Sequence, residues 1–545
     1  MRRFWGIWGV FIAIVYSGAI VLADAPPAPT SASTYQQSCG VVDSHDDFGY
    51  PVDTSQFQLI NPFMRPNARF EGQLHAGDDW VSIEGPSLGL AVRAFAPGRV
   101  TYSNPEGWGR DRGVVIVQHT FPTGSVFSVY GHMEESGDYL FPAEGTCVNK
   151  GDIVGAISDP RPAPHLHFEI RTMWPNYPGP GYWTVDPRLR GWLNPRQFIE
   201  NWRGWLHPTH RWHTTLIDES GPRFDPIFRA DGMVLFVDDN QYRAYNNEGG
   251  RLWEYRLADS IEVVGFAGLT DGDTQVALIG AADGRIQIWN QYGGFLEEWS
   301  TGLAGIAQGP IVLGQSILLI DTNATLHVYD HQRQPLAEYA GISRITGQAS
   351  TPQLNAILTS GNELLVFSSD GVLLERAEVL PNSDLAAAPD GNIYLRNQGT
   401  LEMIAPDGTH TPEVDNLEIN RTDSAMLATH SNLLVMWGVN GRDVLSAFSL
   451  EGEMVWTTEV GVENLSHVRL IEADACTLVM ADQTGHILVL DTQTGSILGK
   501  VSVWGDYRNE VWVGSYPNEN LLRVLLSNQL LGFDINVLSG RACGS

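Results

Sequence analysis

The stretch Ala244-Tyr245-Asn246-Asn247-Glu248-Gly249 ends an apolar run with a polar turn, and the same pattern returns seven more times along the chain. Taking its second residue as a marker, the positions are 245, 289, 329, 367, 404, 448, 490 and 533. The steps between successive markers lie between 37 and 44 residues. A repeat near 40 residues, built from strand, turn and strand, is the spacing of β-propeller blades. We therefore predict a β-propeller over residues 229–545.

Each marker is expected near the end of the third strand of a blade, where a turn leads into the fourth strand. Eight markers predict eight blades, and seven blades remain the alternative if one terminal unit is a cap. A solenoid is the competing repeat architecture, but the repeats contain no helical segment and no leucine-rich or tetratricopeptide pattern. They lack the Gly-His and Trp-Asp signatures of WD repeats and resemble the propellers of outer-membrane-assembly proteins and quinoproteins.

Residues 58–205 follow a different pattern, in which short apolar runs are separated by Gly and Pro turns. The runs are Leu90–Ala94, Gly98–Tyr102, Val114–Gln118, Val126–Tyr130, Ile153–Ile157 and Leu166–Ile170. Their lengths are those of strands, and no stretch shows a sustained 3.6-residue period. We predict an antiparallel β domain here and a linker over residues 206–228, so that the whole chain is all-β.

Composition excludes two classes of protein. Hydrophobic residues make up 43% of the 545 residues and charged residues 18%, which excludes a disordered chain. The net charge of −30 argues against a nucleic-acid partner, because phosphate contacts need basic patches. The negative charge is uneven, with −5 in residues 1–209 and −25 in residues 210–545.

The N-terminus has the pattern of an export signal. Arg2 and Arg3 precede an uncharged apolar run, residues 4–23, and a small-x-small pattern ends at Ala25. This order predicts a secretory signal over residues 1–25, followed by an N-terminal linker over residues 26–57. Twenty apolar residues are also enough to span a bilayer, so an uncleaved membrane anchor is the alternative. Both interpretations place the rest of the chain outside the cytoplasm.

Four cysteines in an exported chain permit two disulfides, with three possible connectivities. We favour Cys39–Cys147 and Cys476–Cys543, because each pair then stays inside or beside one predicted domain. No Cys-x-x-Cys is present, which argues against a thiolate metal site.

Three histidine motifs stand in the first predicted domain. They are His75-x-x-x-Asp79, Tyr130-Gly131-His132 and His165-Leu166-His167. Residues two apart on a strand share a face, so the last two histidines can converge on one point. Imidazole and carboxylate both suit Zn²⁺, and three protein ligands plus water is the layout of a catalytic zinc site. His75, one aspartate and one residue of the His-x-His pair can supply such a set.

The order of these motifs resembles the lysostaphin/LytM-type zinc endopeptidases of bacterial cell walls. The segments between the motifs also resemble the family. Residues 91–100 have its Ala-x-x-Gly-x-Val form, and residues 145–155 have its spacing of Val and Gly. Residues 164–170 match the family's Pro-His-Leu-His-Phe-Glu-Ile signature closely. The resemblance covers about residues 58–200.

The resemblance implies roles for five residues. His75, Asp79 and His167 would be the zinc ligands, and His132 and His165 the catalytic pair. Asp79 is chosen over Asp78 because the family's aspartate lies four residues after its first histidine. Zinc would activate a water and polarise the scissile carbonyl. One histidine would act as general base and the other would stabilise the oxyanion, and which does which stays open.

Other residues near the motifs are open to two interpretations. The loop 158–163 departs from the family's Gly/Ser/Thr-rich loop, which bears on substrate preference. Glu169 is either a support for His167 or a surface glutamate, and His119 is expected to be structural. Five aromatic residues either rim a substrate groove or, as we favour, pack a closing segment: Trp174, Tyr177, Tyr182, Trp183 and Trp192.

The predicted function is an exported zinc endopeptidase that hydrolyses the peptide cross-links of peptidoglycan. The alternatives are a non-hydrolytic wall-binding scaffold that activates other hydrolases, and a secreted zinc protease acting on Gly-rich proteins. The nearly balanced first domain suits an anionic wall, while the acidic propeller suits a cationic protein partner. We expect the protein outside the cell, in the wall or in the periplasm, with membrane contact only through an uncleaved segment 4–23.

Overall fold

The computed structural model describes residues 39–216, 222–229, 231–238, 240–258, 261–271, 274–397, 399–414, 425–429, 433–437, 444–460, 467–505, 510–516 and 520–540. The predicted export signal and most of the N-terminal linker lie outside these ranges. Within them, no helix is both long and apolar enough to cross a membrane. Nearly all described elements are strands of antiparallel sheets, so the prediction of a mostly β chain is confirmed.

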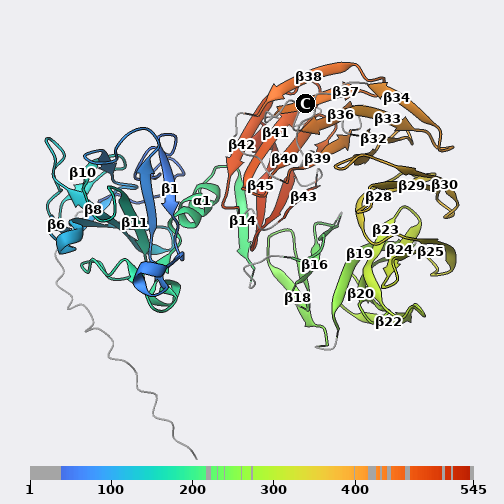
Figure 1. Ribbon diagram of the computed structural model, residues 1–545, viewed down its shortest axis with the longest axis horizontal. Coiled ribbons are helices and arrows are strands. Elements are labelled where there is room, and N and C mark those ends of the chain that lie inside the picture. Colours follow the sequence, from blue (N-terminus) through green and yellow to red (C-terminus); the bar gives the residue numbers. More distant parts are fainter. Residues whose placement is uncertain are drawn as a thin grey trace, which may run out of the picture. The chain divides into compact units, whose positions relative to one another are not determined.

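Residues 39–209, the N-terminal region, are built on one large sheet and one small sheet (Figure 1). The large sheet has the order β1-β4-β11-β8-β7-β6-β9, with β10 beside β8 and β5, and β13 beside β11. Its strands are β1 Phe57–Asn61, β4 Asp78–Ser82, β5 Ala91–Arg93, β6 Gly98–Asn104, β7 Gly113–Phe121, β8 Gly124–Glu134, β9 Cys147–Val148, β10 Ile153–Ile157, β11 Leu166–Arg171 and β13 Trp192–Leu193. All six predicted runs are strands.

The small sheet has the order β12-β3-β2 and carries the start of the first histidine motif. Its strands are β2 Pro66–Asn67, β3 Gln73–His75 and β12 Tyr182–Trp183. Three short 3-10 helices lie in the connections of the region: η1 Ala68–Phe70, η2 Gly109–Asp111 and η3 Pro187–Arg190.

The burial of both faces of β7 explains why the sequence of this region contains continuous apolar runs. Val115 and Val117 belong to the main hydrophobic core, whereas Val114 and Ile116 belong to a smaller cluster on the opposite face. A strand covered on both faces needs apolar side chains at successive positions rather than at alternate ones.

A helix in the N-terminal region contradicts the expectation that no stretch has helical periodicity. Helix α1 spans Pro195–Trp205, with the Asn194 side chain as N-cap and Pro195 in its first turn. Ile199 and Trp202 are buried in the main core, three residues apart on one face. The helix is only eleven residues long, and its Trp and Arg residues hide the period that its apolar face follows.

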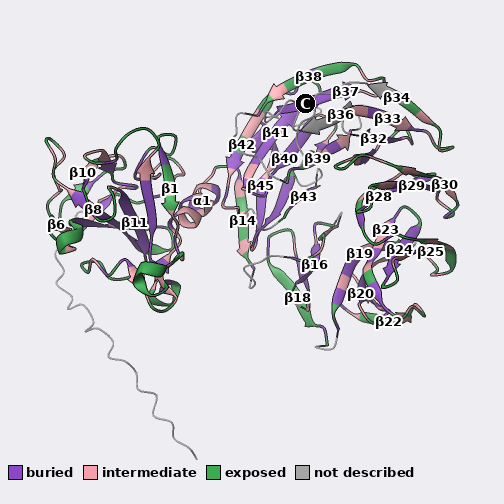
Figure 2. Ribbon diagram, viewed as in Figure 1, coloured by how far each residue is buried: buried purple, intermediate pink, exposed green. Residues whose placement is uncertain are grey.

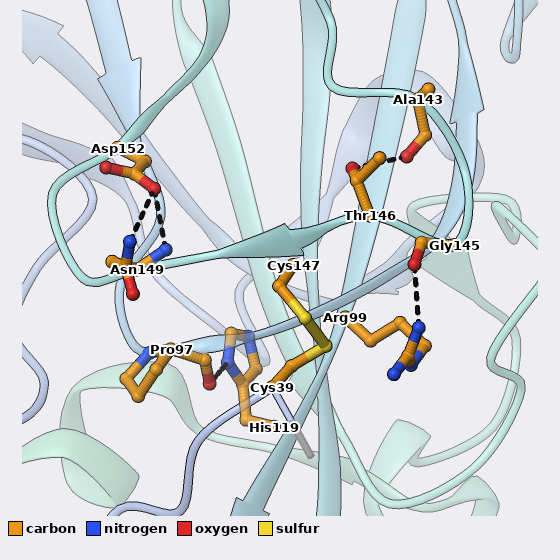
Figure 3. The surroundings of a disulfide bond; sticks show 10 residues. All are labelled: Cys39, Pro97, Arg99, His119, Ala143, Gly145, Thr146, Cys147, Asn149 and Asp152. Atoms are coloured by element: carbon orange, nitrogen blue, oxygen red, sulfur yellow. Dashed lines mark hydrogen bonds between the residues drawn. A yellow bond between two sulfur atoms is a disulfide. The ribbon is translucent and has the colours of Figure 1, made fainter. Parts of the chain in front are cut away.

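A disulfide joins Cys39 to Cys147 of β9, across 108 residues, which confirms the first of the two favoured pairings (Figure 3). Near it, His119 is buried and contacts the Pro97 carbonyl oxygen through Nδ1 at 2.9 Å and the Ser128 hydroxyl through Nε2 at 2.8 Å. His119 is therefore structural, as predicted. Cys476 is also disulfide-bonded, while Cys543, its predicted partner, lies outside the described residues.

Residues 210–540, the eight-sheet region, form eight four-stranded antiparallel sheets within the described ranges. The first four complete sheets in chain order are β15 Ile227–Phe228, β16 Val234–Asp238, β17 Gln241–Tyr245 and β18 Arg251–Arg256; β19 Val263–Asp271, β20 Thr274–Ala281, β21 Arg285–Asn290 and β22 Phe295–Ser300; β23 Ile306–Leu313, β24 Ser316–Asp321, β25 Thr325–Asp330 and β26 Pro335–Ala340; and β27 Ile345–Ser350, β28 Leu354–Thr359, β29 Glu363–Ser368 and β30 Leu373–Glu378.

The remaining sheets follow the same pattern until the last, which takes its outer strand from the start of the region. They are β31 Asp384–Ala387, β32 Ile393–Asn397, β33 Thr400–Ile404 and β34 His410–Val414; β35 Met426–Ala428, β36 Leu433–Trp437, β37 Val444–Ser449 and β38 Met454–Glu459; β39 Arg469–Asp474, β40 Thr477–Ala481, β41 His486–Asp491 and β42 Ile497–Ser502; and β43 Val511–Tyr516, β44 Leu521–Leu526 and β45 Gln529–Asp534, completed by β14 His210–Thr215.

All eight repeat markers fall in the third strand of a sheet, as predicted, from Tyr245 in β17 to Phe533 in β45. The segment 206–228, predicted as a linker, differs from that expectation because it supplies the strands β14 and β15. The repeats were also expected to contain no helix, but the short helix α2, Ile535–Ser539, follows β45 with Asp534 as its N-cap. Strand β14 pairs with β45, more than 300 residues away along the chain, so no local pattern predicts it.

Hydrophobic clusters join each sheet of this region to the next. For example, Leu235 of one sheet and Ile279 of the next share a cluster. Val234 and Phe236 of the first sheet share another with Trp512 and Leu525 of the last. Second and third strands such as β16 and β17 are mostly buried, and outer strands such as β18, β22 and β38 are mostly exposed (Figure 2).

Candidate metal centre

Three of the five predicted site residues meet at one point in the N-terminal region. His75 ends β3, Asp79 lies on β4 and His167 lies on β11. Strands β4 and β11 are neighbours, and Asp79 stands directly opposite His167 in their register. The turn Ala76-Gly77 returns the chain from β3 to β4, and a Cβ on Gly77 would lie 2.4 Å from the Phe168 carbonyl oxygen. Glycine at this turn therefore lets His75 approach the sheet.

The ligand-type atoms of these residues face one another. His75 Nε2 lies 3.0 Å from His167 Nδ1 and 3.2 Å from Asp79 Oδ1, and His167 Nδ1 lies 2.9 Å from Asp79 Oδ1. All three residues are buried. Ligands about 2 Å from one tetrahedral zinc ion stand roughly 3.4 Å apart, so only small shifts separate this arrangement from a metal-bound one.

The charge of this group also fits a cation. The pKa of Asp79 is held well below its usual value, against the effect of burial, by hydrogen bonds from His167 and His75. The pKa of His167 rises to about 10, against its own burial, because Asp79 and Glu169 contact it. A site that favours a positive charge this strongly, with two imidazoles and a carboxylate as donors, suits a divalent metal such as zinc.

The tandem Asp78-Asp79 is divided between two roles. Asp78 points away from the histidines, where its Oδ1 accepts the Phe63 backbone N–H at 2.9 Å and its Oδ2 lies 3.4 Å from Arg196 Nε. Successive residues of a strand face opposite sides, so only Asp79 reaches the centre. Burial raises the pKa of Asp78, which Arg196 opposes.

Glu169 is buried and supports His167 from behind, so the alternative of a surface glutamate is wrong. Its Oε1 lies 3.0 Å from His167 Nε2, and its Oε2 accepts the Trp192 indole N–H at 2.7 Å. Arg171, also buried, lies 3.5 Å from the same carboxylate. This arrangement leaves His167 Nδ1 directed toward the centre and fixes the plane of its ring.

His132 reaches the site through a break in regular pairing. Gly131 stands opposite Val114 and Met133 opposite Gly113, so His132 is an extra residue in β8, with a positive φ of 59°. Such a bulge turns one side chain out of the alternation of its strand. A non-glycine residue held at positive φ is a feature that clusters at functional sites.

Trp108 packs on the bulge and borders the site. A Cβ on Gly131 would lie 2.1 Å from the Trp108 ring, so this position has no room for a side chain. The indole N–H donates to the Gly179 carbonyl oxygen at 2.7 Å. The ring contacts both His132 and His167, at centroid distances of 5.1 and 5.3 Å. No motif in the sequence marks Trp108.

His132 and His165 lie side by side, with ring centroids 4.5 Å apart. His132 Nδ1 contacts the Asp111 carbonyl oxygen at 2.8 Å, and His165 Nδ1 contacts the Ala163 carbonyl oxygen at 2.8 Å. A carbonyl oxygen only accepts, so each Nδ1 carries a proton, and in the neutral form of either ring the lone pair lies on Nε2. His165 Nε2 faces the centre, 3.8 Å from Asp79 Oδ1. Burial lowers the pKa of His132 to about 3, and charge repulsion from His165 and His167 adds to this effect.

Two further residues lie at the centre: Asn61, which no motif marks, and Tyr182, one of the aromatics expected either to rim a groove or, as we favoured, to pack. The Asn61 side-chain amide donates one hydrogen bond to Asp79 Oδ2 at 2.8 Å and a second to the Tyr182 hydroxyl oxygen at 3.1 Å. Tyr182 lies over His75 with ring centroids 4.9 Å apart. Asn61 ends an unremarkable strand, β1, and only its pairing with β4 brings it to Asp79.

The other four late aromatics divide between core and surface. Trp192 is fully buried and contacts Trp183, in keeping with the favoured packing interpretation. Trp174 and Tyr177 are exposed and contact each other at a centroid distance of 5.9 Å.

The chain is similar to two solved structures at low identity. One is the crystal structure of BamB from Moraxella catarrhalis, with 15% sequence identity, a TM-score of 0.45, and coverage of 60% of this chain and 99% of that chain. The other is the crystal structure of the computationally designed Ika8 protein, with 16% identity, a TM-score of 0.46, and coverage of 60% and 100%. No curated protein matches the chain.

A family model does match part of the N-terminal region. Residues 74–179 match Peptidase family M23. This segment contains His75, Asp79, His132, His165 and His167, so it includes all five predicted site residues. The match supports a metallopeptidase-type enzyme and indicates peptidase or peptidoglycan hydrolase activity.

Proposed function

We propose that the protein is an exported zinc endopeptidase that hydrolyses the peptide cross-links of bacterial peptidoglycan. The observation that carries the proposal is the convergence of His75, Asp79 and His167, with His132 and His165 beside them, inside the segment that matches Peptidase family M23. Buried polar residues that come from separate strands and face one point are typical of a catalytic centre.

His75 Nε2, Asp79 Oδ1 and His167 Nδ1 would hold the metal, and Glu169 would orient His167. Bound zinc supplies Lewis-acid chemistry and lowers the pKa of water. Asn61 would keep Asp79 in place through its hydrogen bond to that carboxylate. Tyr182 would keep His75 in place, since its ring contacts the imidazole.

His132 and His165 would handle the protons of the reaction. Each ring is fixed by a backbone carbonyl so that Nε2 is the free acceptor. One Nε2 would take the proton of the attacking water and pass it on to the leaving amine, and the other ring, when protonated, would stabilise the oxyanion. Trp108 covers both His132 and His167 and would exclude water from this side.

We infer that the eight sheets form a closed eight-bladed propeller. Support comes from the last sheet, which combines β43, β44 and β45 with the N-terminal strand β14. The cluster that joins the first sheet to the last also supports closure, as does a Cβ position on Gly514 only 2.6 Å from the Phe228 ring. The first strands of all eight sheets line one cavity, as the centre of a ring requires.

The experiment that tests the proposal is digestion of purified peptidoglycan by the full-length protein, with and without chelator, beside casein and elastin. We expect new amino termini from the wall cross-links, detected by mass spectrometry, that disappear with chelator and return with zinc. Cleavage of elastin alone would replace the substrate class with Gly-rich proteins. Binding to the wall without new termini, at full zinc occupancy, would instead indicate a scaffold.

A further inference from the structure

A large cavity lies where the first strands of the eight sheets meet. It has a volume of about 1110 Å³ and is lined by residues of β15, β19, β23, β27, β31, β35, β39 and β43 and by the segments that precede them. Nothing in the peptidase centre involves these residues, so the cavity is a separate feature of the molecule.

Arginines gather at this cavity although the surrounding region is strongly acidic. Residues 210–545 carry a net charge of −25, yet Arg223, Arg344, Arg396 and Arg469 all line the cavity. Guanidinium groups form two parallel hydrogen bonds with carboxylates and phosphates, so a cluster of them favours oxyanions.

The carboxylates of the cavity leave part of this arginine set unpaired. Arg469 Nη2 contacts Glu510 Oε2 at 2.9 Å. Asp225, a second carboxylate, accepts the Trp512 indole N–H at 2.9 Å. Among the described residues, Arg223 and Arg344 have no carboxylate within ion-pair distance, and both are exposed and line the cavity.

Arg396 is the most unusual member of the set because it is buried, with 2% of its surface exposed. Its Nη2 donates to the Asn382 carbonyl oxygen at 2.8 Å, while its Nε has no hydrogen-bond partner in the described part of the chain. It stands opposite Asp384 in the pairing of β31 and β32, and this carboxylate, which also lines the cavity, attracts the charge of Arg396. A buried, incompletely satisfied guanidinium is costly unless a further acceptor reaches it.

The cavity also offers backbone groups to a ligand. Each of the eight first strands lies at the edge of its sheet, so one row of its N–H and C=O groups has no partner strand among the described residues. At Ile345 of β27, the Gln308 side chain fills that role, accepting the N–H at 2.8 Å and donating to the carbonyl oxygen at 3.1 Å. An amide from another chain can make the same pair of contacts at other edge positions.

We propose that this cavity binds a short acidic peptide, whose carboxylates contact Arg223, Arg344 and Arg396 and whose amides contact the exposed strand edges. A peptide suits the mixture of arginines and exposed strand edges, because it carries both carboxylates and amides, whereas a phosphate polymer has no amide to pair with the strand edges. The proposal rests on the closed propeller proposed above and is independent of the peptidase activity.

The test is fluorescence anisotropy of the full-length protein with a fluorescein-labelled hexapeptide of alternating Ala and Glu. Chelator is present, so that cleavage cannot alter the signal. We expect saturable binding that weakens about tenfold or more in Arg344→Gln and Arg223→Gln, because each loses charge-assisted hydrogen bonds. Arg285→Gln is the matched control, since it removes the same charge from an exposed side chain on β21 that does not line the cavity.

The same peptide with its carboxylates amidated should bind at least about tenfold more weakly. Equal affinity in Arg344→Gln, Arg223→Gln and Arg285→Gln would overturn the proposal, as would the absence of saturable binding. Tighter binding of a polyphosphate than of the peptide would overturn the peptide assignment. Loss of wall hydrolysis in other experiments leaves this result unaffected, so failure of the two proposals can be told apart.

Discussion

Both regions of the molecule bury charged side chains, but they do so differently. In the eight-sheet region, Arg243 of β17 is buried and contacts Asp238 of the neighbouring β16 at 2.7 Å and Glu254 of the neighbouring β18 at 3.0 Å. In the N-terminal region, His75, Asp79 and His167 come from two different sheets and meet at one point.

The difference distinguishes buried charges that stabilise the fold from buried charges that are arranged for catalysis. A buried ion pair between neighbouring strands satisfies its own charges and leaves no group free. The N-terminal group leaves donor atoms facing one another, and two further imidazoles beside them keep free Nε2 atoms. A substitution in one of the two regions should therefore affect either activity or stability, depending on the region.

The largest effect is expected from His132→Ala. Loss of this imidazole should reduce peptidoglycan hydrolysis by roughly 10²- to 10⁴-fold, because one proton-transfer group is removed. The zinc content should not change, since His132 is not among the three converging residues. The control is His486→Ala on β41, which should retain full activity. Equal activity of His132→Ala and the unchanged protein would remove His132 from the mechanism.

In the eight-sheet region, Arg243→Ala should lower the free energy of unfolding by about 3 to 5 kcal/mol, because the buried Asp238 loses the guanidinium charge of Arg243. Hydrolysis per folded molecule should not change. Arg251→Ala is the control, since this exposed arginine contacts the same Glu254 and should cost at most about 1 kcal/mol. Denaturant titration measures both variants, and equal losses would contradict the distinction between buried and exposed pairs.

His119 gives the N-terminal region a dependence of stability on pH. Burial lowers its pKa to about 4 in the folded protein, below the usual 6.5, so the unfolded chain binds more protons between these values. Its contribution is therefore complete above pH 6.5 and lost as the pH falls toward 4, by about 3 kcal/mol in all. Urea unfolding of the protein and of His119→Gln at several pH values should show a smaller loss in the variant. Parallel curves would be inconsistent with a buried neutral imidazole.

The smallest effect is expected from Glu169→Gln, which removes the charge behind His167 but keeps the size of the side chain. Metal affinity should fall by about 10- to 100-fold, as measured by competition with a chelator. Glu200→Gln on α1 is the control, because that carboxylate contacts Tyr50 and Arg203 rather than the centre. A similar fall in both variants would show a general loss of stability instead.

Local patterns in the sequence predicted most of the fold. The repeat markers identified the third strand of all eight sheets, because each is followed by a short turn whose residues are set locally. The strand β14 was missed because its place is decided by pairing with β45. Helix α1 carried a readable signal, since Asn194 and Pro195 are a helix start.

The candidate site was predicted in part. Motif order brought His75, Asp79 and His167 into one hypothesis, and the structure places them together. The bulge at His132, the cover provided by Trp108 and the contact of Asn61 with Asp79 depend on register between strands distant in sequence. No local pattern records such a register.

The measurement that tests the central claim most directly is the zinc content of the purified protein beside its Asp79→Asn and Asp78→Asn variants. Asp79 faces the two histidines, whereas its neighbour Asp78 faces Phe63 and Arg196. We predict one zinc ion per chain in the unchanged protein and in Asp78→Asn, with a large loss in Asp79→Asn. Zinc retained in full by Asp79→Asn, or lost equally from both variants, would contradict the account.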